Sequence, residues 1–322
     1  MGPCGEVLGE FLAGGGAGRG CCFLGSASAQ LRNRDFLQCA NRLYNEPVSL
    51  PPMSNHLVLL TIVLYAASLG GYIAFLATTR RLFGQLGTLL LVSGLACHYL
   101  ALLERSRWAH TVPYDDLYGS LSLFAWLLGA TYLGLELFHR DRSVGALVLP
   151  FVIAVFLLAQ GTRAPVLAPP PAQGPLLALH ITLDVLGYAA FALSFVLSAI
   201  YLVQNSLLRS RRMGSIIWRF PALESLERMS RSSVIVGLVS LLVGITFGLL
   251  WVNRIFGHYW NGDPKEIITV VILAVYAGYL WLGRTGSWRG ARASALCVFN
   301  FVLVLFSYSV VNLDLSNFHR FF

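Results

Sequence analysis

Residues 251–266 read W-V-N-R-I-F-G-H-Y-W-N-G-D-P-K-E and lie between two long apolar runs. A segment in this position is expected to be the short loop where the chain leaves a membrane and enters it again. The loop carries three large aromatic side chains and one histidine, namely Trp251, Tyr259, Trp260 and His258. Flat aromatic faces beside the fixed charges at 263–266 favour a flat, amphipathic ligand at the membrane surface.

The composition on both sides of this loop is that of a membrane protein. The 322 residues are 56% hydrophobic and only 12% charged, whereas soluble domains carry roughly 25% charged residues. The net charge of +8 comes from arginines that gather in short loops between apolar runs. Because no aromatic-plus-basic RNA-binding motif accompanies them, we expect no nucleic-acid partner.

Eight apolar runs are long enough, or nearly so, to cross the hydrocarbon layer, which takes about 20 helical residues. The runs are 56–78, 83–103, 117–138, 144–160, 176–204, 232–252, 267–283 and 293–313. Since irregular backbone cannot lie in lipid, the runs should be helices. The sequence therefore predicts an all-α polytopic protein with eight transmembrane helices in a lipid bilayer.

The arginines predict the orientation of these helices. Loops after the first, third, fifth and seventh runs hold most of them, and arginine-rich loops face the cytoplasm. The 251–266 loop and both ends of the helical region are then expected on the extracytoplasmic side.

Residues 1–52 differ from the rest, being rich in glycine and cysteine and without periodicity. We interpret them either as a disordered leader or as a mis-annotated extension of a chain that starts at Met53 instead of Met1. The helical domain is expected at 53–322. No two cysteines form a C-x-x-C pair, which argues against a thiol redox or zinc site.

Two histidines are expected on the same membrane face as the aromatic loop. His180 starts the fifth run, and His319 follows the eighth. Haem iron takes axial imidazole ligands, and the haem macrocycle needs aromatic walls. The haem propionates favour nearby cations such as Arg254 and Lys265. Histidines at helix ends are also common as plain interfacial residues, so both interpretations stay open at this point.

Other ionisable residues lie within or beside the runs. Asp184 is one turn after His180 and is expected either to support it or to pair with another helix. His98 is expected to be a packed, hydrogen-bonded histidine, with a substitute intramembrane ligand as the alternative. Glu136 is expected to reach the headgroups. The segment Pro113-Tyr114-Asp115-Asp116 is expected to cap the third helix, with both aspartates suited to the cap and to the helix dipole.

The 251–266 segment resembles the tryptophan-rich WWD signature of the cytochrome c assembly proteins, in particular the CcsA (ResC) branch. The resemblance extends over about 56–322. Its further matches are L-Y-G-S-L-S-L-F-A-W-L-L (117–128), G-A-L-V-L-P (145–150), L-H-I-T-L-D-V-L-G-Y-A-A-F (179–191), F-P-A-L-E-S-L-E-R (220–228), W-R-G-A-R-A (288–293) and V-N-L-D-L-S-N-F-H (311–319).

The resemblance implies a system II haem-binding subunit in a bacterial inner (cytoplasmic) membrane, with haem b on the extracytoplasmic side. It implies His180 and His319 as axial ligands of the iron. The other implied haem-contacting residues are Trp251, Arg254, His258, Tyr259, Trp260, Asp263 and Lys265. Implied partners are a CcsB/ResB-like membrane protein and an apocytochrome c with a C-x-x-C-H motif, in a cytochrome c haem lyase complex.

Several positions depart from the family pattern, among them Gly119, which replaces a glutamate common in the motif of the third helix. Phe256 and Asn261-Gly262 replace tryptophan-containing parts of the loop, and Trp281 stands where the family tends to carry an intramembrane histidine. These departures motivate the alternative of a haem transporter or membrane regulator that keeps the fold without ligation activity.

Overall fold

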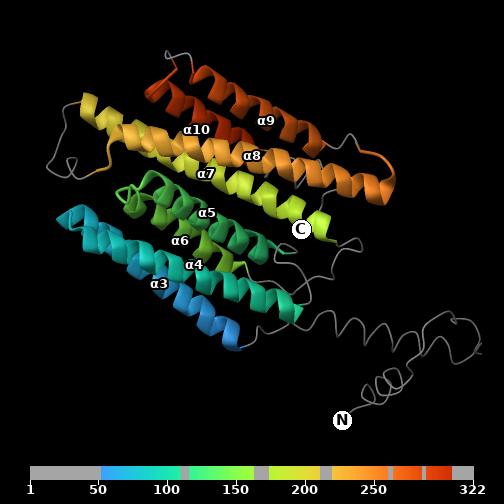
Figure 1. The fold of residues 1–322 in the computed structure, drawn as a ribbon, viewed down its shortest axis with the longest axis horizontal. Coiled ribbons are helices and arrows are strands. Elements are labelled where there is room, and N and C mark those ends of the chain that lie inside the picture. The colour runs from blue at the N-terminus through green and yellow to red at the C-terminus, as the bar shows by residue number, and fades with distance from the viewer. Residues whose placement is uncertain are drawn as a thin grey trace, which may run out of the picture. The chain divides into compact units, whose positions relative to one another are not determined.

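The computed structural model describes residues 52–109, 116–162, 174–210, 220–259, 264–284 and 288–306. These residues form helices with short connections and contain no strand (Figure 1). The helices are α3 (Pro52–Thr78), α4 (Arg81–Ala109), α5 (Leu117–His139), α6 (Gly145–Gly161), α7 (Pro175–Arg209), α8 (Leu223–Phe256), α9 (Pro264–Leu282) and α10 (Ala291–Phe306). The predicted all-α fold is confirmed. The predicted leader falls almost entirely outside the described residues.

The eight apolar runs correspond one to one with these helices. The largest difference is at α8, which begins at Leu223 rather than at the predicted residue 232. Its first turns are polar in sequence, but Leu226 and Met229 are fully buried three residues apart. One face of this extension therefore packs inside the bundle, and that stabilises helix beyond the purely apolar stretch.

Five of the described helices are long and apolar enough to span a membrane by themselves. These are Asn55–Thr78, Arg81–Arg107, Leu117–His139, Pro175–Arg209 and Leu223–Ile255. The apolar parts of α6, α9 and α10 are shorter, at Gly145–Gly161, Glu266–Leu282 and Ala291–Phe306. The chain is a multi-pass membrane protein, and the predicted total of eight spans stays a prediction.

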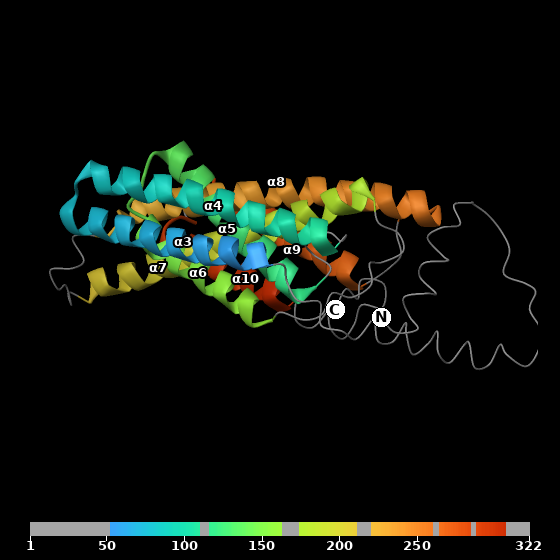
Figure 2. The same cartoon turned by 90° about the horizontal axis from the view of Figure 1, so that it is seen from below.

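The described helices of the Leu50–Phe322 unit run alternately in opposite directions (Figures 1 and 2). Figures 1 and 2 show the C-terminal ends of α3, α5, α7 and α9 at one end of this unit, with the N-terminal ends of α4, α6, α8 and α10. The start of α7 and the last turns of α8 lie at the other end. His180 and Trp251 are therefore at the same end of the bundle, as the sequence predicted, and the loop arginines Arg80 and Arg140 are at the opposite end.

Glycines bring neighbouring helix backbones close together. A Cβ atom on Gly71 of α3 would lie 3.0 Å from the Cα atom of Gly87 in α4, and one on Gly187 of α7 would lie 3.1 Å from the carbonyl oxygen of Gly237 in α8. Small residues at such positions allow tight van der Waals packing in lipid, where the hydrophobic effect drives no helix association.

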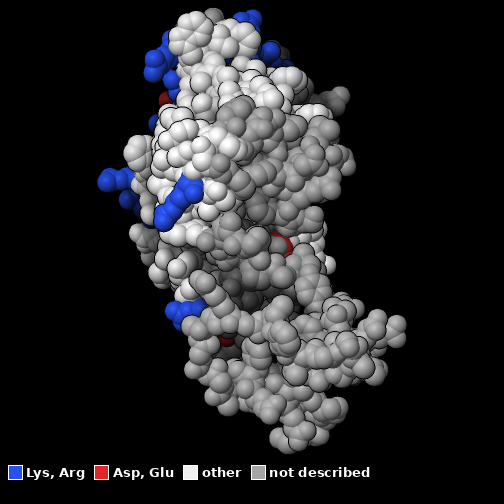
Figure 3. Space-filling model, turned by 90° about the vertical axis from the view of Figure 1, so that its right-hand side faces the viewer, with Lys and Arg blue, Asp and Glu red and all other residues white. Residues whose placement is uncertain are grey.

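Apolar side chains also cover much of the outer surface. Leu59, Leu158 and Phe138 are among many large apolar residues that are mostly exposed. In the view of Figure 3, most of the described surface is neither acidic nor basic, with Lys and Arg in scattered places. This surface is suited to contact with lipid acyl chains.

Candidate functional site

His180 lies near the start of α7, where Pro175 occupies the first turn and Gly174 precedes it. Its Nδ1 atom is 2.9 Å from the carbonyl oxygen of Gly244 in α8. A carbonyl oxygen only accepts hydrogen bonds, so Nδ1–H is the donor, and the neutral ring carries its lone pair on Nε2. The side chain is 19% exposed. This arrangement fixes the ring and leaves the nitrogen that metals bind available.

Two glycines of α8 make room for this ring and its neighbour. A Cβ atom on Gly248 would lie 2.8 Å from both Cε1 and Nδ1 of His180, and one on Gly244 would collide with the Asp184 carboxylate. Sequence reasoning missed both glycines. Their four-residue spacing in G-I-T-F-G is the small-residue pattern of tightly packed membrane helices, and it was a usable signal.

Asp184 lies on the same face of α7 as His180, as the sequence predicted. Its Oδ2 atom is 3.4 Å from Nδ1 of His180, farther than the Gly244 carbonyl oxygen, which takes the hydrogen bond. We therefore expect Asp184 to act mainly through its negative charge, which stabilises positive charge on the imidazole or on a metal bound to it.

The last turns of α8 extend the site toward the membrane surface. Trp251 follows Gly248 by three residues, so it lies on the same face of α8, one turn nearer the helix end. Helix α8 ends where Gly257 adopts a left-handed conformation, with φ of 76°. Beyond this turn His258 and Tyr259 are exposed, as is Arg254 in the last helical turn. An aromatic surface and a cation are thus near the His180 end of the bundle.

The remaining predicted site residues lie outside the described part of the chain. Trp260, Asp263 and His319 are among them, and Lys265 is placed in the first turn of α9 without a described side chain. The pairing of His180 with His319 stays a prediction. The described residues fit one axial ligand, part of an aromatic wall and one cation of a haem site.

His98 is fully buried between α3, α4, α5 and α6. Its Nδ1 atom is 3.1 Å from the Tyr65 hydroxyl, and its Nε2 atom is 2.9 Å from the Ser122 hydroxyl. The ring also packs on Phe156, with ring centroids 4.2 Å apart. Because both nitrogens are engaged, the expected packed histidine is confirmed, and the alternative of a substitute ligand is wrong.

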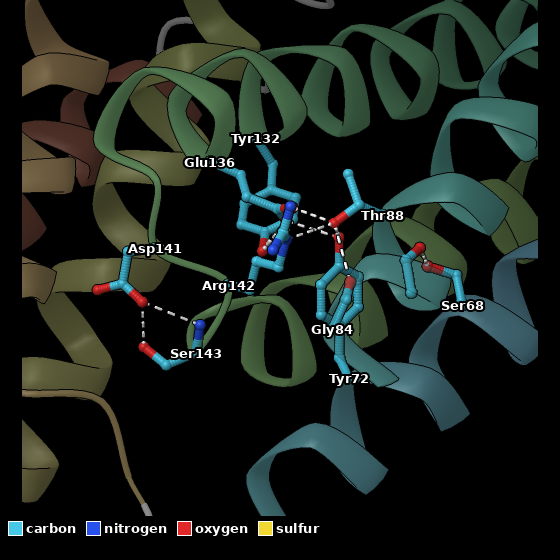
Figure 4. Close-up of polar contacts among 10 residues, drawn as sticks. Ser68, Tyr72, Gly84, Thr88, Tyr132, Glu136, Asp141, Arg142 and Ser143 are labelled. Atoms are coloured by element: carbon cyan, nitrogen blue, oxygen red, sulfur yellow. Dashed lines mark hydrogen bonds and ion pairs between the residues drawn. The ribbon is translucent and has the colours of Figure 1, made fainter. Parts of the chain in front are cut away.

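Glu136 does not reach the headgroups, so that prediction is wrong. Its carboxylate is buried and accepts hydrogen bonds from the hydroxyls of Tyr72 at 2.5 Å, Thr88 at 2.5 Å and Tyr132 at 2.7 Å (Figure 4). Arg142 adds an ion pair at 3.6 Å. A carboxylate inside a membrane bundle needs such partners, which sequence spacing alone does not reveal because they come from three helices and a loop.

Asp116 caps α5 as predicted. Its side chain accepts a hydrogen bond of 2.8 Å from the backbone N–H of Gly119, which satisfies one of the open donors of the first turn. The same carboxylate forms a buried ion pair with Arg105 of α4. The cap therefore also ties α4 to α5 at the His180 end.

Comparisons with known proteins agree with this architecture. Residues 114–319 match the family described as Cytochrome C assembly protein. Protein HemX of Brevibacillus brevis is 29% identical over 81% of this chain and 96% of its own length. The Cytochrome c biogenesis protein CcsA of Guillardia theta is 26% identical over 84% of this chain and 96% of its own length.

A solved structure shares the fold. Cytochrome c Heme Lyase CcmF superposes with a TM-score of 0.56 and 17% identity, over 81% of this chain and 47% of its own length. This chain thus spans about half of that structure. The family match covers well over half of the 322 residues, including the described site residues on α7 and α8. The chain therefore belongs to the cytochrome c assembly protein family.

Proposed function

We propose that this protein binds haem b at the His180 end of the bundle and presents it during cytochrome c biogenesis. The observation that carries the proposal is the hydrogen bond from His180 Nδ1 to the Gly244 carbonyl oxygen, which directs the ring and leaves Nε2 as the ligating nitrogen. Family membership and the nearby aromatic turn of α8 support the same conclusion.

Each part of the site has a separate role in the proposal. Bound haem would supply an iron that imidazole can ligate and vinyl groups for thioether bonds. His180 and His319 would hold the iron, and Trp251, Tyr259 and Trp260 would form the aromatic wall. Arg254 and Lys265 pair with the propionates, and His258 and Asp263 complete the polar edge. The protein contributes binding and orientation rather than acid–base chemistry.

The setting of this chemistry is also a proposal. The site faces the extracytoplasmic side of a bacterial inner membrane, because the opposite end carries the arginine-rich loops. The partners are a CcsB/ResB-like membrane protein and an apocytochrome c with a C-x-x-C-H motif, in a system II haem lyase complex. The names of CcsA and of the heme lyase CcmF among the similar proteins support this setting.

Imidazole rescue tests the role of His180. The full chain, purified with haem, is expected to show a six-coordinate low-spin spectrum that His180→Gly loses and that added imidazole restores. His56→Gly is the matched control, since His56 is an exposed histidine at the same end of the bundle. An unchanged low-spin spectrum in His180→Gly contradicts the proposal.

A haem transporter or membrane regulator without ligation activity is the second candidate. Trp281 of α9, at the position where an intramembrane histidine is expected for the family, is 67% exposed and so does not point into a buried site. One of the similar proteins is named HemX rather than CcsA. A deletion strain that still matures c-type cytochromes favours this candidate, and loss of covalent cytochrome c favours the first.

A further inference from the structure

A cavity lies at the end of the bundle opposite to His180. Its volume is about 310 Å³, and it is lined by Glu136, Leu137, Arg140 and Arg142, at the end of α5 and in the connection to α6. It shares no residue with the proposed haem site. Two arginines and an apolar side chain around one opening suggest an amphiphilic ligand with a negative charge.

Contacts within the bundle hold one of these arginines in place. The Nε atom of Arg142 donates a hydrogen bond of 3.0 Å to the Thr88 hydroxyl and lies 3.6 Å from Glu136 Oε1 (Figure 4). Thr88 and two tyrosines already satisfy the Glu136 carboxylate. Within the described residues, the two terminal nitrogens of Arg142 have no hydrogen-bond partner. Their donors are therefore available to a ligand in the cavity.

Arg140 adds a second cation to the same opening. It ends α5 in a left-handed conformation with φ of 55° and is exposed. It forms no hydrogen bond or ion pair with any residue that the structure describes. Asp141, between the two arginines in sequence, accepts hydrogen bonds from Ser143 and Ser225 instead. The lining therefore carries Arg140 and Arg142 against the single carboxylate of Glu136, which pairs with Arg142 and leaves a net positive charge.

A third arginine, Arg81, lies in the first turn of α4. A Cβ atom on Gly84 of α4 would be 3.0 Å from Cδ of Arg142, so the first turn of α4 is beside the cavity. Arg81 precedes Gly84 by three residues, on the same helix face, and is exposed. Planar guanidinium groups bind phosphate oxygens in pairs, which makes a phosphate or phosphodiester the matching anion.

The apolar surface beside the cavity favours a lipid over a soluble anion. Leu137 is 57% exposed and Phe138 is 77% exposed at the end of α5, and Leu82 is 69% exposed at the start of α4. These side chains continue the lipid-facing surface up to the arginines. A free phosphate gains nothing from such a surface, whereas a phospholipid places its acyl chains along it.

We propose that the Arg140–Arg142 cavity binds the phosphate of an anionic phospholipid, with Arg81 at its rim and acyl chains along Leu137 and Phe138. Basic groups between helix ends at a cytoplasmic membrane face suit anionic lipid headgroups, and each contributes about 1 kcal/mol, or roughly fivefold in affinity. The proposal does not depend on haem binding.

Lipid titration of the purified full chain tests this inference. Phosphatidylglycerol is expected to raise the melting temperature and to remain bound in native mass spectrometry, and phosphatidylcholine is not. The double variant Arg81→Gln/Arg140→Gln is expected to bind phosphatidylglycerol roughly 25-fold more weakly, a fivefold loss for each arginine. The variant keeps Arg142, so the buried Glu136 contacts remain.

Arg209→Gln is the matched control, an exposed arginine at the same end of the bundle, in the last turn of α7. It is expected to bind phosphatidylglycerol as the unchanged chain does. Arg140→Lys, which keeps the charge without the planar fork, is a second variant and is expected to fall in between. Equal binding by the double variant, equal stabilisation by phosphatidylcholine, or full stabilisation by inorganic phosphate alone overturns the proposal.

Discussion

Gly248→Ala probes the contact on which the candidate site depends. The new Cβ atom would lie 2.8 Å from Cε1 and Nδ1 of His180, about 0.6 Å closer than the 3.4 Å at which ordinary van der Waals contact begins. The ring, or α7 as a whole, must move by about that amount. The hydrogen bond from His180 to the Gly244 carbonyl oxygen is 2.9 Å, so the same shift away from that oxygen lengthens it to about 3.5 Å, beyond useful strength.

Two readouts follow from this displacement. Overpacking costs roughly 1–3 kcal/mol, so the melting temperature of the purified protein should fall by roughly 2–6 °C. In the haem-loaded protein, the low-spin spectrum should weaken because the His180 ring is no longer held in place.

Gly134→Ala is the matched control, because a Cβ atom on Gly134 in α5 would meet nothing within 4 Å. It should leave the spectrum unchanged and raise stability by roughly 0.5–1 kcal/mol, the usual gain of alanine over glycine in a helix. If Gly248→Ala and Gly134→Ala behave alike in both measurements, the described packing around His180 is refuted.

Three further predictions concern buried or paired carboxylates. Asp184→Asn should raise the reduction potential of bound haem, because a negative charge near His180 is lost. Spectroelectrochemistry measures this potential. An unchanged potential argues against the electrostatic role of Asp184. Glu136→Ala should cost roughly 3–5 kcal/mol, because it leaves Arg142 and three hydroxyls without their acceptor, and a loss below 1 kcal/mol in thermal unfolding contradicts the described network. Burial raises the pKa of Asp141, but hydrogen bonds from Ser143 and Ser225 and the positive charge of Arg228 outweigh this effect, so the pKa is lowered overall. Ionised Asp141 therefore stabilises the fold above its ordinary pKa of 3.8. This stabilisation is lost as the pH falls through the lowered pKa. Asp141→Asn should therefore lower the melting temperature at pH 7 and have little effect at the acid end, and a pH-independent difference contradicts the assignment.

The helices were predictable because lipid leaves the backbone so few choices. A long apolar run must satisfy its own hydrogen bonds, so 117–138 and 176–204 correspond to α5 (Leu117–His139) and α7 (Pro175–Arg209) with only the ends displaced. The alternation of helices then placed His180 and Trp251 at one end. The Asp116 cap was predictable for a similar reason, since it depends only on neighbours along the chain.

The pairings between helices were not predictable in this way. The register of α7 against α8 determines which residue of α8 faces His180. A shift of one residue along α8 would bring a bulky neighbour of Gly248 against the ring. Glu136 was misplaced for the same reason, because its partners Tyr72 and Thr88 come from α3 and α4. Local sequence carries no direct signal of such distant partners.

The most direct test of the central claim is low-temperature electron paramagnetic resonance of the haem-loaded full chain and its His180→Ala and His319→Ala variants. Two imidazoles on one iron predict a low-spin bis-histidine signal that each single substitution converts to high spin. Persistence of the low-spin signal in either variant contradicts the claim that these two histidines ligate the same iron.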